Sequence, residues 1–328
     1  MYIPLVHASC RLGQVAEFHL EWVDNAPIIN GQVNGHPVRI LLETGSSLTF
    51  ITNKAAHQLN LPVREYRERA ILEVGGWKGI ETAVVNELRI DGFVLKDYTI
   101  GVVPTEIQDA NGVAILQLSA DFLSHFTTEL DFAHGVVRLL LPQDCKLEQL
   151  AYWTPSYFRI DVSPFSPDTP FLLLPVKLNG KHMKAHLVSG SAISFVTPQS
   201  ARDAGVVPGG QNTEPAGDIV GLKAEPIPTW IGRFDTLDVG GETIKNARLR
   251  IGEVFPGTKY RPNNSVDMHL GSDFLQANRL IIVPGKDAIL FTYNGGAVFQ
   301  LERPDEAAPG LPDRSLPLDK GSTTLHED

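Results

Sequence analysis

Cysteine, basic charge and long apolar runs are all scarce in this sequence, and each scarcity excludes a class of protein. Only 2 of the 328 residues are cysteine, too few for a disulfide-based scaffold. Lysine and arginine number 28 against 38 acidic residues and form no cluster of the kind that binds nucleic-acid phosphates. No apolar run approaches the roughly 18 residues that a membrane-spanning helix needs. We therefore predict no nucleic-acid partner and no membrane span.

The two cysteines, Cys10 and Cys145, allow at most one bridge. Because a single pair gives no framework of spacings, we interpret them as two unrelated thiols, with one disulfide as the alternative. The first ten residues lack the basic start and long apolar stretch of a signal peptide. The compartment stays open: cytoplasmic as the sequence stands, or exported if a signal peptide precedes it.

What the sequence does have is the composition of a globular protein. Hydrophobic residues make up 43% and charged residues 20%. The length is enough for two domains that each bury a core of their own.

One pattern occurs twice, in residues 40–51 and 185–196. Each copy is an apolar run, a variable residue, Thr or Ser, Gly, Ser and a second apolar run. The variable residue is Glu43 in the first copy and Val188 in the second. At the same offset Asn34-Gly35 superposes on Asn179-Gly180, and Asn-Gly between apolar segments predicts a tight hairpin before each copy.

The rest of each half repeats in the same order. Short helices are predicted after each copy, over residues 53–59 and 199–204, with Thr52 and Thr197 as caps and Pro198 in the first helical position. Three more elements follow in both halves. A further hairpin is predicted at residues 88–92 and 237–241, an Asp-Phe-Leu segment at 121–123 and 273–275, and an alternating strand pair at 128–140 and 280–293. Brief helices among many short strands predict an all-β protein of two homologous lobes.

The predicted boundaries follow from the repeat. An N-terminal segment covers residues 1–20, the first lobe 21–141, a linker rich in Pro, Ser and aromatic residues 142–170, and the second lobe 171–302. The tail, residues 303–328, is rich in Pro, Gly and charge and is predicted to be disordered.

The order of these elements resembles the retropepsin-like aspartic proteases, in the duplicated single-chain form found in bacteria. The resemblance implies an acid-protease fold of two lobes with a cleft between them that binds an extended peptide. It also implies a flap hairpin that closes over the peptide, here with Gly75, Gly76 and Trp77 at its tip. The corresponding segment of the second lobe contains Pro226 and Pro228, which predict a shorter or distorted hairpin.

In the family the variable position is aspartate in both lobes, and the two carboxylates share one proton. Val188 removes one carboxylate, and Glu43 moves the other by about 1.5 Å because it has one more methylene. The loop residues around them are retained: Thr44, Gly45, Ser46, Ser189, Gly190 and Ser191. In the family the Thr and Ser hydroxyls bond the two loops to each other. We therefore expect the two loops to adopt the conformation of the family and to lack its two catalytic aspartates.

Serine and histidine residues outside the acid positions do not form a recognisable catalytic or metal site. A nucleophile at Ser189 or Ser191 with His186 is disfavoured because no acid is placed to orient the histidine. His182, His186 and His269 lack the spacing of a zinc site, so we expect no metal and no cofactor.

Two further expectations concern structural positions. Asp121 and Asp273 are interpreted as helix N-caps, and Ser119 in place of the family's glycine puts the close backbone approach in the first lobe in doubt.

The leading hypothesis is a pseudo-protease, monomeric, whose cleft binds a peptide or protein segment without cutting it. The first alternative is an active peptidase that uses Glu43 with a second acid that is unpredicted or supplied by a dimer. The other alternative is a structural or interaction protein with a vestigial cleft.

Overall fold

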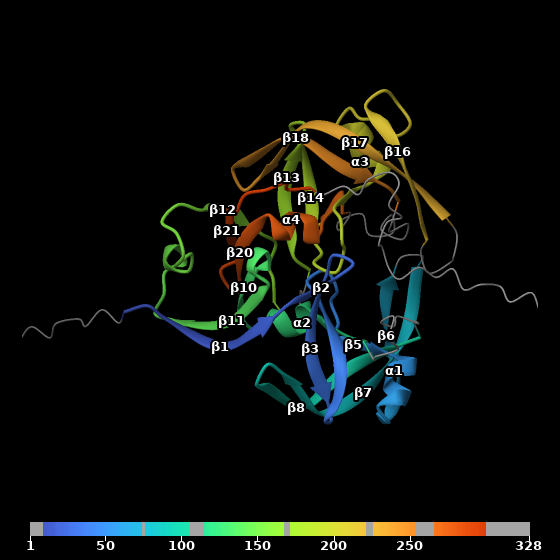
Figure 1. Cartoon of the computed structure of the whole chain (residues 1–328), viewed down its shortest axis with the longest axis vertical. Coiled ribbons are helices and arrows are strands. Elements are labelled where there is room, and N and C mark those ends of the chain that lie inside the picture. The colour runs from blue at the N-terminus through green and yellow to red at the C-terminus, as the bar shows by residue number, and fades with distance from the viewer. Residues whose placement is uncertain are drawn as a thin grey trace, which may run out of the picture.

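The computed structural model describes residues 9–73, 76–104, 115–166, 171–220, 226–253 and 266–299, with the backbone alone for 65–73, 76–80 and 220. Strands dominate the described chain, as the sequence predicts, and Figure 1 shows one lobe above the other. The predicted tail and the tip residue Gly75 lie outside the described residues.

The first lobe is a closed barrel. Its sheet runs in the order β2-β3-β4-β9-β5-β8-β7-β6, and a further pairing of β3 with β7 closes six of these strands on themselves. The turn between β3 and β4 is Asn34-Gly35, with φ of 51° and 81°, as the predicted tight hairpin requires. The strands are β2 (Glu21–Val23), β3 (Ala26–Val33), β4 (His36–Glu43), β5 (Phe50–Thr52), β6 (Val63–Glu73), β7 (Gly76–Ile90), β8 (Phe93–Val103) and β9 (Ile115–Ser119).

The second lobe repeats this barrel. Its order, β13-β14-β19-β15-β18-β17-β16 with β13 also paired to β17, repeats that of the first lobe from β3 to β6, and β2 has no counterpart among the described residues. Asn179-Gly180 again forms the tight turn, with φ of 47° and 76°. The strands are β13 (Leu173–Leu178), β14 (Lys181–Leu187), β15 (Phe195–Val196), β16 (Thr213–Val220), β17 (Pro226–Val239), β18 (Glu242–Ile251) and β19 (Met268–Leu270).

A third sheet joins the lobes and is visible at the left of Figure 1. At its centre β10 (Thr127–Asp131) of the first half pairs antiparallel with β20 (Asn278–Val283) of the second. Outside them lie β11 (Val136–Gln143) and β21 (Ala288–Tyr293), and at the edges β1 (Arg11–His19) and β12 (Phe158–Asp161). The edge strands come from the segments for which the sequence predicted no element, 1–20 and 142–170.

The short helices lie where the repeat predicts them. Helix α1 (Asn53–Gln58) is capped by the Thr52 hydroxyl, and α3 (Pro198–Asp203) by that of Thr197. The remaining helices are α2 (Ala120–Leu123), α4 (Ser272–Gln276) and the single 3₁₀ turns η1 (Phe132–His134) and η2 (Leu147–Gln149). None of the helices in the described chain is both long and apolar enough to cross a membrane.

Strand alternation sets which side chains enter the barrels. On β4 Ile40 and Leu42 are fully buried in the core, and on β14 Ala185 and Leu187 are their counterparts. The intervening residues therefore point to the opposite face of each sheet. The repeated loops begin where β4 and β14 end. The packing of these strands in the barrel cores therefore sets the direction in which each loop leaves its barrel.

The interpretation of the cysteines as unrelated thiols is wrong. Cys10 and Cys145 form a disulfide across 135 positions of sequence. The reason is the pairing of β1 with β11, in which Arg11 lies opposite Gln143 and brings the flanking cysteines together. No strand is predicted over residues 11–19, so nothing local in the sequence indicates that the two cysteines meet.

Candidate functional site

The two repeated loops meet and bond to each other through their hydroxyl residues. The Thr44 hydroxyl donates to the Leu187 carbonyl at 2.8 Å, and the Ser189 hydroxyl donates to the Leu42 carbonyl at 2.7 Å. In return the Thr44 N–H donates to the Ser189 Oγ at 2.9 Å, and the Ser189 N–H to the Thr44 Oγ1 at 3.0 Å. Both residues are buried, so these four bonds form a dry link between the lobes.

Glu43 lies directly above this link and reaches both loops. Its Oε1 accepts the Gly45 N–H at 2.6 Å, and a Cβ added at Gly190 would lie 2.0 Å from its Oε2. The residue is 8% exposed, and burial raises the pKa of its carboxyl to about 7, against the lowering effect of the Gly45 and Gly190 N–H groups. A single acid of nearly neutral pKa thus lies at the meeting point.

Val188, at the equivalent position of the second loop, brings an apolar side chain to the same place. Its methyl groups lie against Gly45, where an added Cβ would be 2.7 Å and 2.9 Å from them. The residue is 9% exposed. Glycine at 45 and 190 is therefore needed for close approach: each glycine receives the side chain that the opposite loop projects.

Asp121 and Asp273 brace the loops, and the prediction that they are N-caps is wrong. The caps are Ser119 and Gly271, and the two aspartates lie two residues further on, in the first turn of each helix. Asp121 accepts the N–H and hydroxyl of Thr49 at 2.9 Å and 2.7 Å. Asp273 accepts the same two groups of Ser194 at 3.0 Å and 2.6 Å, and its burial raises its pKa to about 6.

The first lobe keeps its close backbone approach although Ser119 replaces glycine. The Ala120 N–H donates to the Ser46 carbonyl at 3.0 Å, as the Ser272 N–H does to Ser191 at 2.7 Å. In the second lobe only glycine fits, because a Cβ at Gly271 would lie 2.6 Å from the Ser191 carbonyl oxygen. The two loops are thus held alike by slightly different packing.

The serine hydroxyls of the loops are engaged in structural bonds. The Ser46 hydroxyl donates to the Leu48 carbonyl at 3.2 Å, and that of Ser191 to the Ile193 carbonyl at 2.8 Å. Ser189 is engaged with the first loop, as described above. No hydrogen bond among the described residues joins any of these hydroxyls to His186.

A pair of buried histidines lies beneath the second loop, on the face that Val188 shares. His186 on β14 is opposite His269 on β19, with ring centroids 5.5 Å apart. Burial lowers the pKa of His186 to about 4 and, together with the charge of His186, that of His269 to about 3. Both imidazoles are therefore neutral at neutral pH. The sequence did not indicate that β19 would place a second histidine beside His186.

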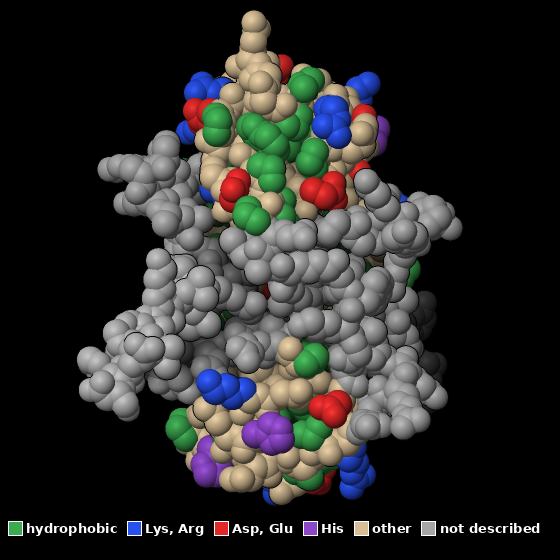
Figure 2. Space-filling view, turned by 90° about the vertical axis from the view of Figure 1, so that its right-hand side faces the viewer, with side chains coloured by type: hydrophobic (Ala, Val, Ile, Leu, Met, Phe, Trp, Pro, Cys, Tyr) green, Lys and Arg blue, Asp and Glu red, His purple; other side chains and the backbone are tan. Residues whose placement is uncertain are grey.

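Within the described part of the chain, no group of three or more His, Cys, Asp or Glu side chains is arranged to hold a metal ion. On the face shown in Figure 2, the described surface of both lobes carries charges of both signs interspersed with polar and apolar groups.

The predicted flap corresponds to strands β6 and β7, which pair up to Glu73 opposite Gly76. The side chain of Trp77 lies outside the described residues. In the second lobe β16 and β17 pair as far as Val220 opposite Pro226, with a register shift between Pro215 and Asp218.

Comparison with known proteins gives the family. A model of the aspartyl protease family matches residues 29–119 and 174–274, more than half of the chain and one match for each lobe. Among solved structures, a retropepsin-like aspartic protease from Rickettsia conorii matches at 20% identity and a TM-score of 0.31, over 41% of this chain and 95% of its own. An aspartic proteinase from Irpex lacteus matches at 10% identity and a TM-score of 0.48, over 87% and 97%. No curated protein sequence matches. The two matches to the family model, one over each repeated loop, show that the chain belongs to the aspartyl protease family.

Proposed function

We propose that the chain is a catalytically impaired aspartic-protease homologue that binds an extended peptide between its lobes without cleaving it. The observation that supports this most strongly is the pairing of Glu43 with Val188 where the two loops meet. Peptide hydrolysis by this family needs one carboxylate to take a proton from water while a second, protonated, polarises the peptide carbonyl. Val188 supplies neither function.

Glu43 alone does not replace the pair. With its pKa at about 7, roughly half of the molecules carry the proton at neutral pH. A protonated Glu43 lacks a base beside it, and an ionised Glu43 lacks an acid. General acid and general base catalysis each contribute about 10²–10⁴-fold, so losing their cooperation removes most of the rate.

Peptide binding requires less than catalysis does. Extended segments bind to β-rich sites by main-chain pairing, which needs strands and not a catalytic pair. The hydroxyl link of Thr44 and Ser189 holds the loops together in the form the family uses, and β6 with β7 supplies a hairpin at the flap position. We propose that the loop residues, with Gly75, Gly76 and Trp77 at the tip, form the binding site.

One observation favours the alternative of an active peptidase. A carboxyl group with a pKa of about 7 is suited to proton transfer near neutral pH, so Glu43 with an acid from a second copy of the chain would form a working pair.

We infer a monomer with lobes at residues 21–141 and 171–302. Sedimentation at increasing concentration tests this, because a dimer that forms together with activity would support the alternative.

The experiment combines turnover and binding. Purified protein is incubated with a diverse peptide library between about pH 3 and 7, the range in which carboxylates act as acids and bases. We expect peptide binding without cleavage, and weaker binding when Trp77 is changed to Ala. Cleavage that pepstatin inhibits and that Glu43→Ala abolishes would refute the proposal in favour of the active peptidase. If the protein neither binds nor cleaves the peptides, the result would favour a structural or interaction protein with a vestigial cleft.

A further inference from the structure

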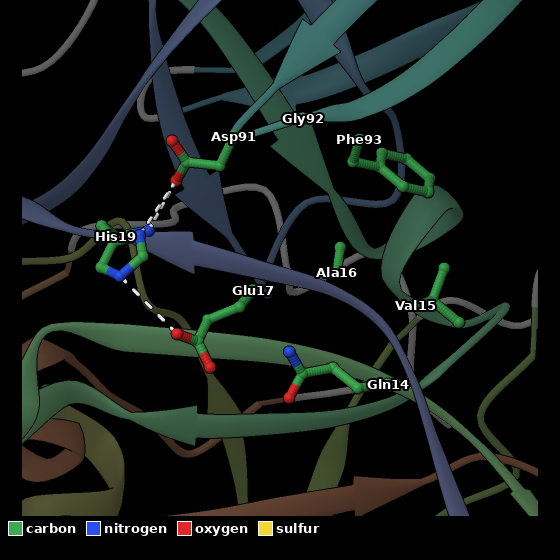
Figure 3. A pocket seen from close by; sticks show the side chains of 8 residues that line it. All are labelled: Gln14, Val15, Ala16, Glu17, His19, Asp91, Gly92 and Phe93. Carbon is green, nitrogen blue, oxygen red and sulfur yellow. Dashed lines mark hydrogen bonds and ion pairs between the residues drawn. The ribbon is translucent and has the colours of Figure 1, made fainter.

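An open groove of about 570 Å³ lies between β1 and the turn that joins β7 to β8. Figure 3 shows Asp91 and Phe93 of the turn on one side and Glu17 and His19 of β1 on the other, with Ala16 between them. None of the lining residues belongs to the two repeated loops. The groove is thus separate from the site proposed above.

The strand along this groove has an open edge. Within the described chain, β1 is the last strand of its sheet and pairs only with β11. The His19 N–H points away from β11, because it donates to the Asp91 carboxylate at 2.8 Å. Backbone groups alternate along a strand, so Glu17, two residues earlier, directs its N–H and C=O to the same outer edge. No backbone hydrogen bond outside the strand pairings joins them to another described residue.

The equivalent place in the second lobe is filled. There the turn at Gly240 packs against the edge strand β12, and an added Cβ would lie 2.6 Å from Ile160 and 2.9 Å from the Arg159 carbonyl oxygen. The repeat aligns Gly240 with Asp91, whose carboxylate accepts the His19 N–H of β1, and Gly241 with Gly92, where an added Cβ would meet nothing within 4 Å. The turn of the first lobe is therefore joined to its edge strand through the Asp91 side chain and leaves space beside Gly92, whereas the turn of the second lobe packs directly on β12.

A difference in side-chain size accompanies the space beside Gly92. On β12 the residue opposite Phe291 is Phe158, whose ring lies 3.8 Å from the Cβ position of Gly241. On β1 the residue opposite Leu139 is Ala16, which has no ring to place beside the turn. The groove lies alongside this smaller residue.

The charges of the groove favour a cationic occupant. Its lining carries two carboxylates, Glu17 and Asp91, and no lysine or arginine. Arg138 on β11 already pairs with Glu17 at 2.7 Å, whereas the basic group beside Asp91 is His19, at 3.5 Å. A lysine or arginine placed in the groove would therefore find its carboxylate at Asp91.

We propose that this groove binds an extended, basic segment of a partner protein, which pairs with the outer edge of β1 and places a lysine or arginine against Asp91. Main-chain pairing would supply affinity and the carboxylate would select the cationic side chain.

The test uses a labelled peptide that alternates lysine and valine, with fluorescence anisotropy as the readout. Two matched peptides accompany it: one with glutamate for lysine, and one with prolines that remove the pairing N–H groups. On the protein side, Asp91→Asn removes the charge and keeps a residue that tolerates the observed φ of 43°. The control is Asp97→Asn, an exposed aspartate of β8 with φ of 51° that lies outside the groove.

We expect the lysine peptide to bind the wild type and Asp97→Asn equally, and Asp91→Asn about 2–5-fold more weakly, the loss of one partly exposed ion pair. The glutamate and proline peptides should bind more weakly still. No binding of the lysine peptide, equal binding of all three peptides, or equal weakening by both variants would overturn the proposal. Self-association of the protein that the lysine peptide fails to disrupt would assign the edge to a second copy and overturn it as well.

Discussion

Glu43 and Val188 occupy one small volume, and each depends on a glycine of the opposite loop. The Glu43 carboxyl extends to Gly190, and the Val188 methyl groups lie on Gly45. An aspartate at position 43 would project less far toward Gly190, because it has one methylene fewer than glutamate. The longer glutamate and the branched valine thus fill the space between the loops in place of the family's two aspartates.

The raised pKa of Glu43 predicts a pH-dependent stability. Its pKa is about 7 in the folded protein against 4.5 unfolded, so between these values the folded state holds a proton that the unfolded state releases. Stability from Glu43 is therefore present below about pH 4.5 and lost as the pH rises through about 7. Glu43→Gln, which mimics the protonated form, should be more stable than wild type by about 1–3 kcal/mol at pH 8 and equal to it near pH 4. Urea unfolding at both pH values checks this, with the exposed Glu148→Gln as a control that should show no such difference.

The buried histidines predict the opposite dependence. Their pKa values are about 4 and about 3 in the folded protein against 6.5 unfolded, so below pH 6.5 the unfolded state takes up protons that the folded state refuses. Their stability is therefore complete above pH 6.5 and falls by about 1.4 kcal/mol per pH unit for each histidine down to about pH 4.

Because Glu43 opposes this effect, the histidine contribution is measured in the Glu43→Gln background. There His186→Phe should reduce the loss of stability on acidification between pH 6.5 and 4 by about 1.4 kcal/mol per pH unit, the contribution of one histidine, since the opposing effect of Asp273 is the same in both proteins. The exposed His182→Phe should leave the slope unchanged, and an unchanged slope in His186→Phe would contradict the assignment of the effect to the buried pair.

At the scale of elements, the local signals in the sequence were sufficient for the repeated parts. Asn-Gly turns, capped helices and the loop pattern each depend on a few neighbouring residues, and the structure places them as predicted. Strands β1 and β12 were missed because edge strands depend on the partner strand they join, which is distant in sequence. The disulfide and the histidine pair were missed for the same reason: each forms only through pairing of strands far apart in the chain.

The link between the loops predicts a large effect from a small change. Thr44→Val keeps the shape of the side chain and removes its bonds to Leu187 and Ser189, which leaves a buried carbonyl and a buried N–H without partners. We expect a loss of about 2–4 kcal/mol in the free energy of unfolding. Ser47→Ala, in the same loop but half-buried, should change stability by less than about 0.5 kcal/mol. Equal effects of the two variants in urea unfolding would contradict the link.

At the scale of the whole molecule, the sheet between the lobes is held by a buried charge cluster. Glu129 on β10 is fully buried and accepts from Arg138 at 2.9 Å, from Arg279 at 2.6 Å and from the Tyr152 hydroxyl at 2.6 Å. Arg279 lies on β20 and its guanidinium stacks 4.5 Å from the Trp153 ring. The cluster thus binds residues of both halves and the connecting segment to one carboxylate.

Removing that charge should weaken the molecule as a unit. Glu129→Gln leaves two guanidinium groups facing a neutral amide, and we expect a loss of about 3–5 kcal/mol. The same change at Glu214, whose partner Arg248 is exposed, should cost less than about 1 kcal/mol. Calorimetry measures both, and a cost at Glu129 no larger than that at Glu214 would show that the cluster does not hold the lobes together.

We propose that the protein keeps the fold of an aspartic protease and lacks only its catalytic pair. The most direct measurement compares peptide cleavage by the wild type with that by the double variant Glu43→Asp/Val188→Asp, which restores an acid of the family's type to each loop. We expect no turnover by the wild type and pepstatin-sensitive turnover by the double variant, since the hydroxyl link and both glycines are already in place. Turnover by the wild type that equals or exceeds that of the double variant would contradict this proposal.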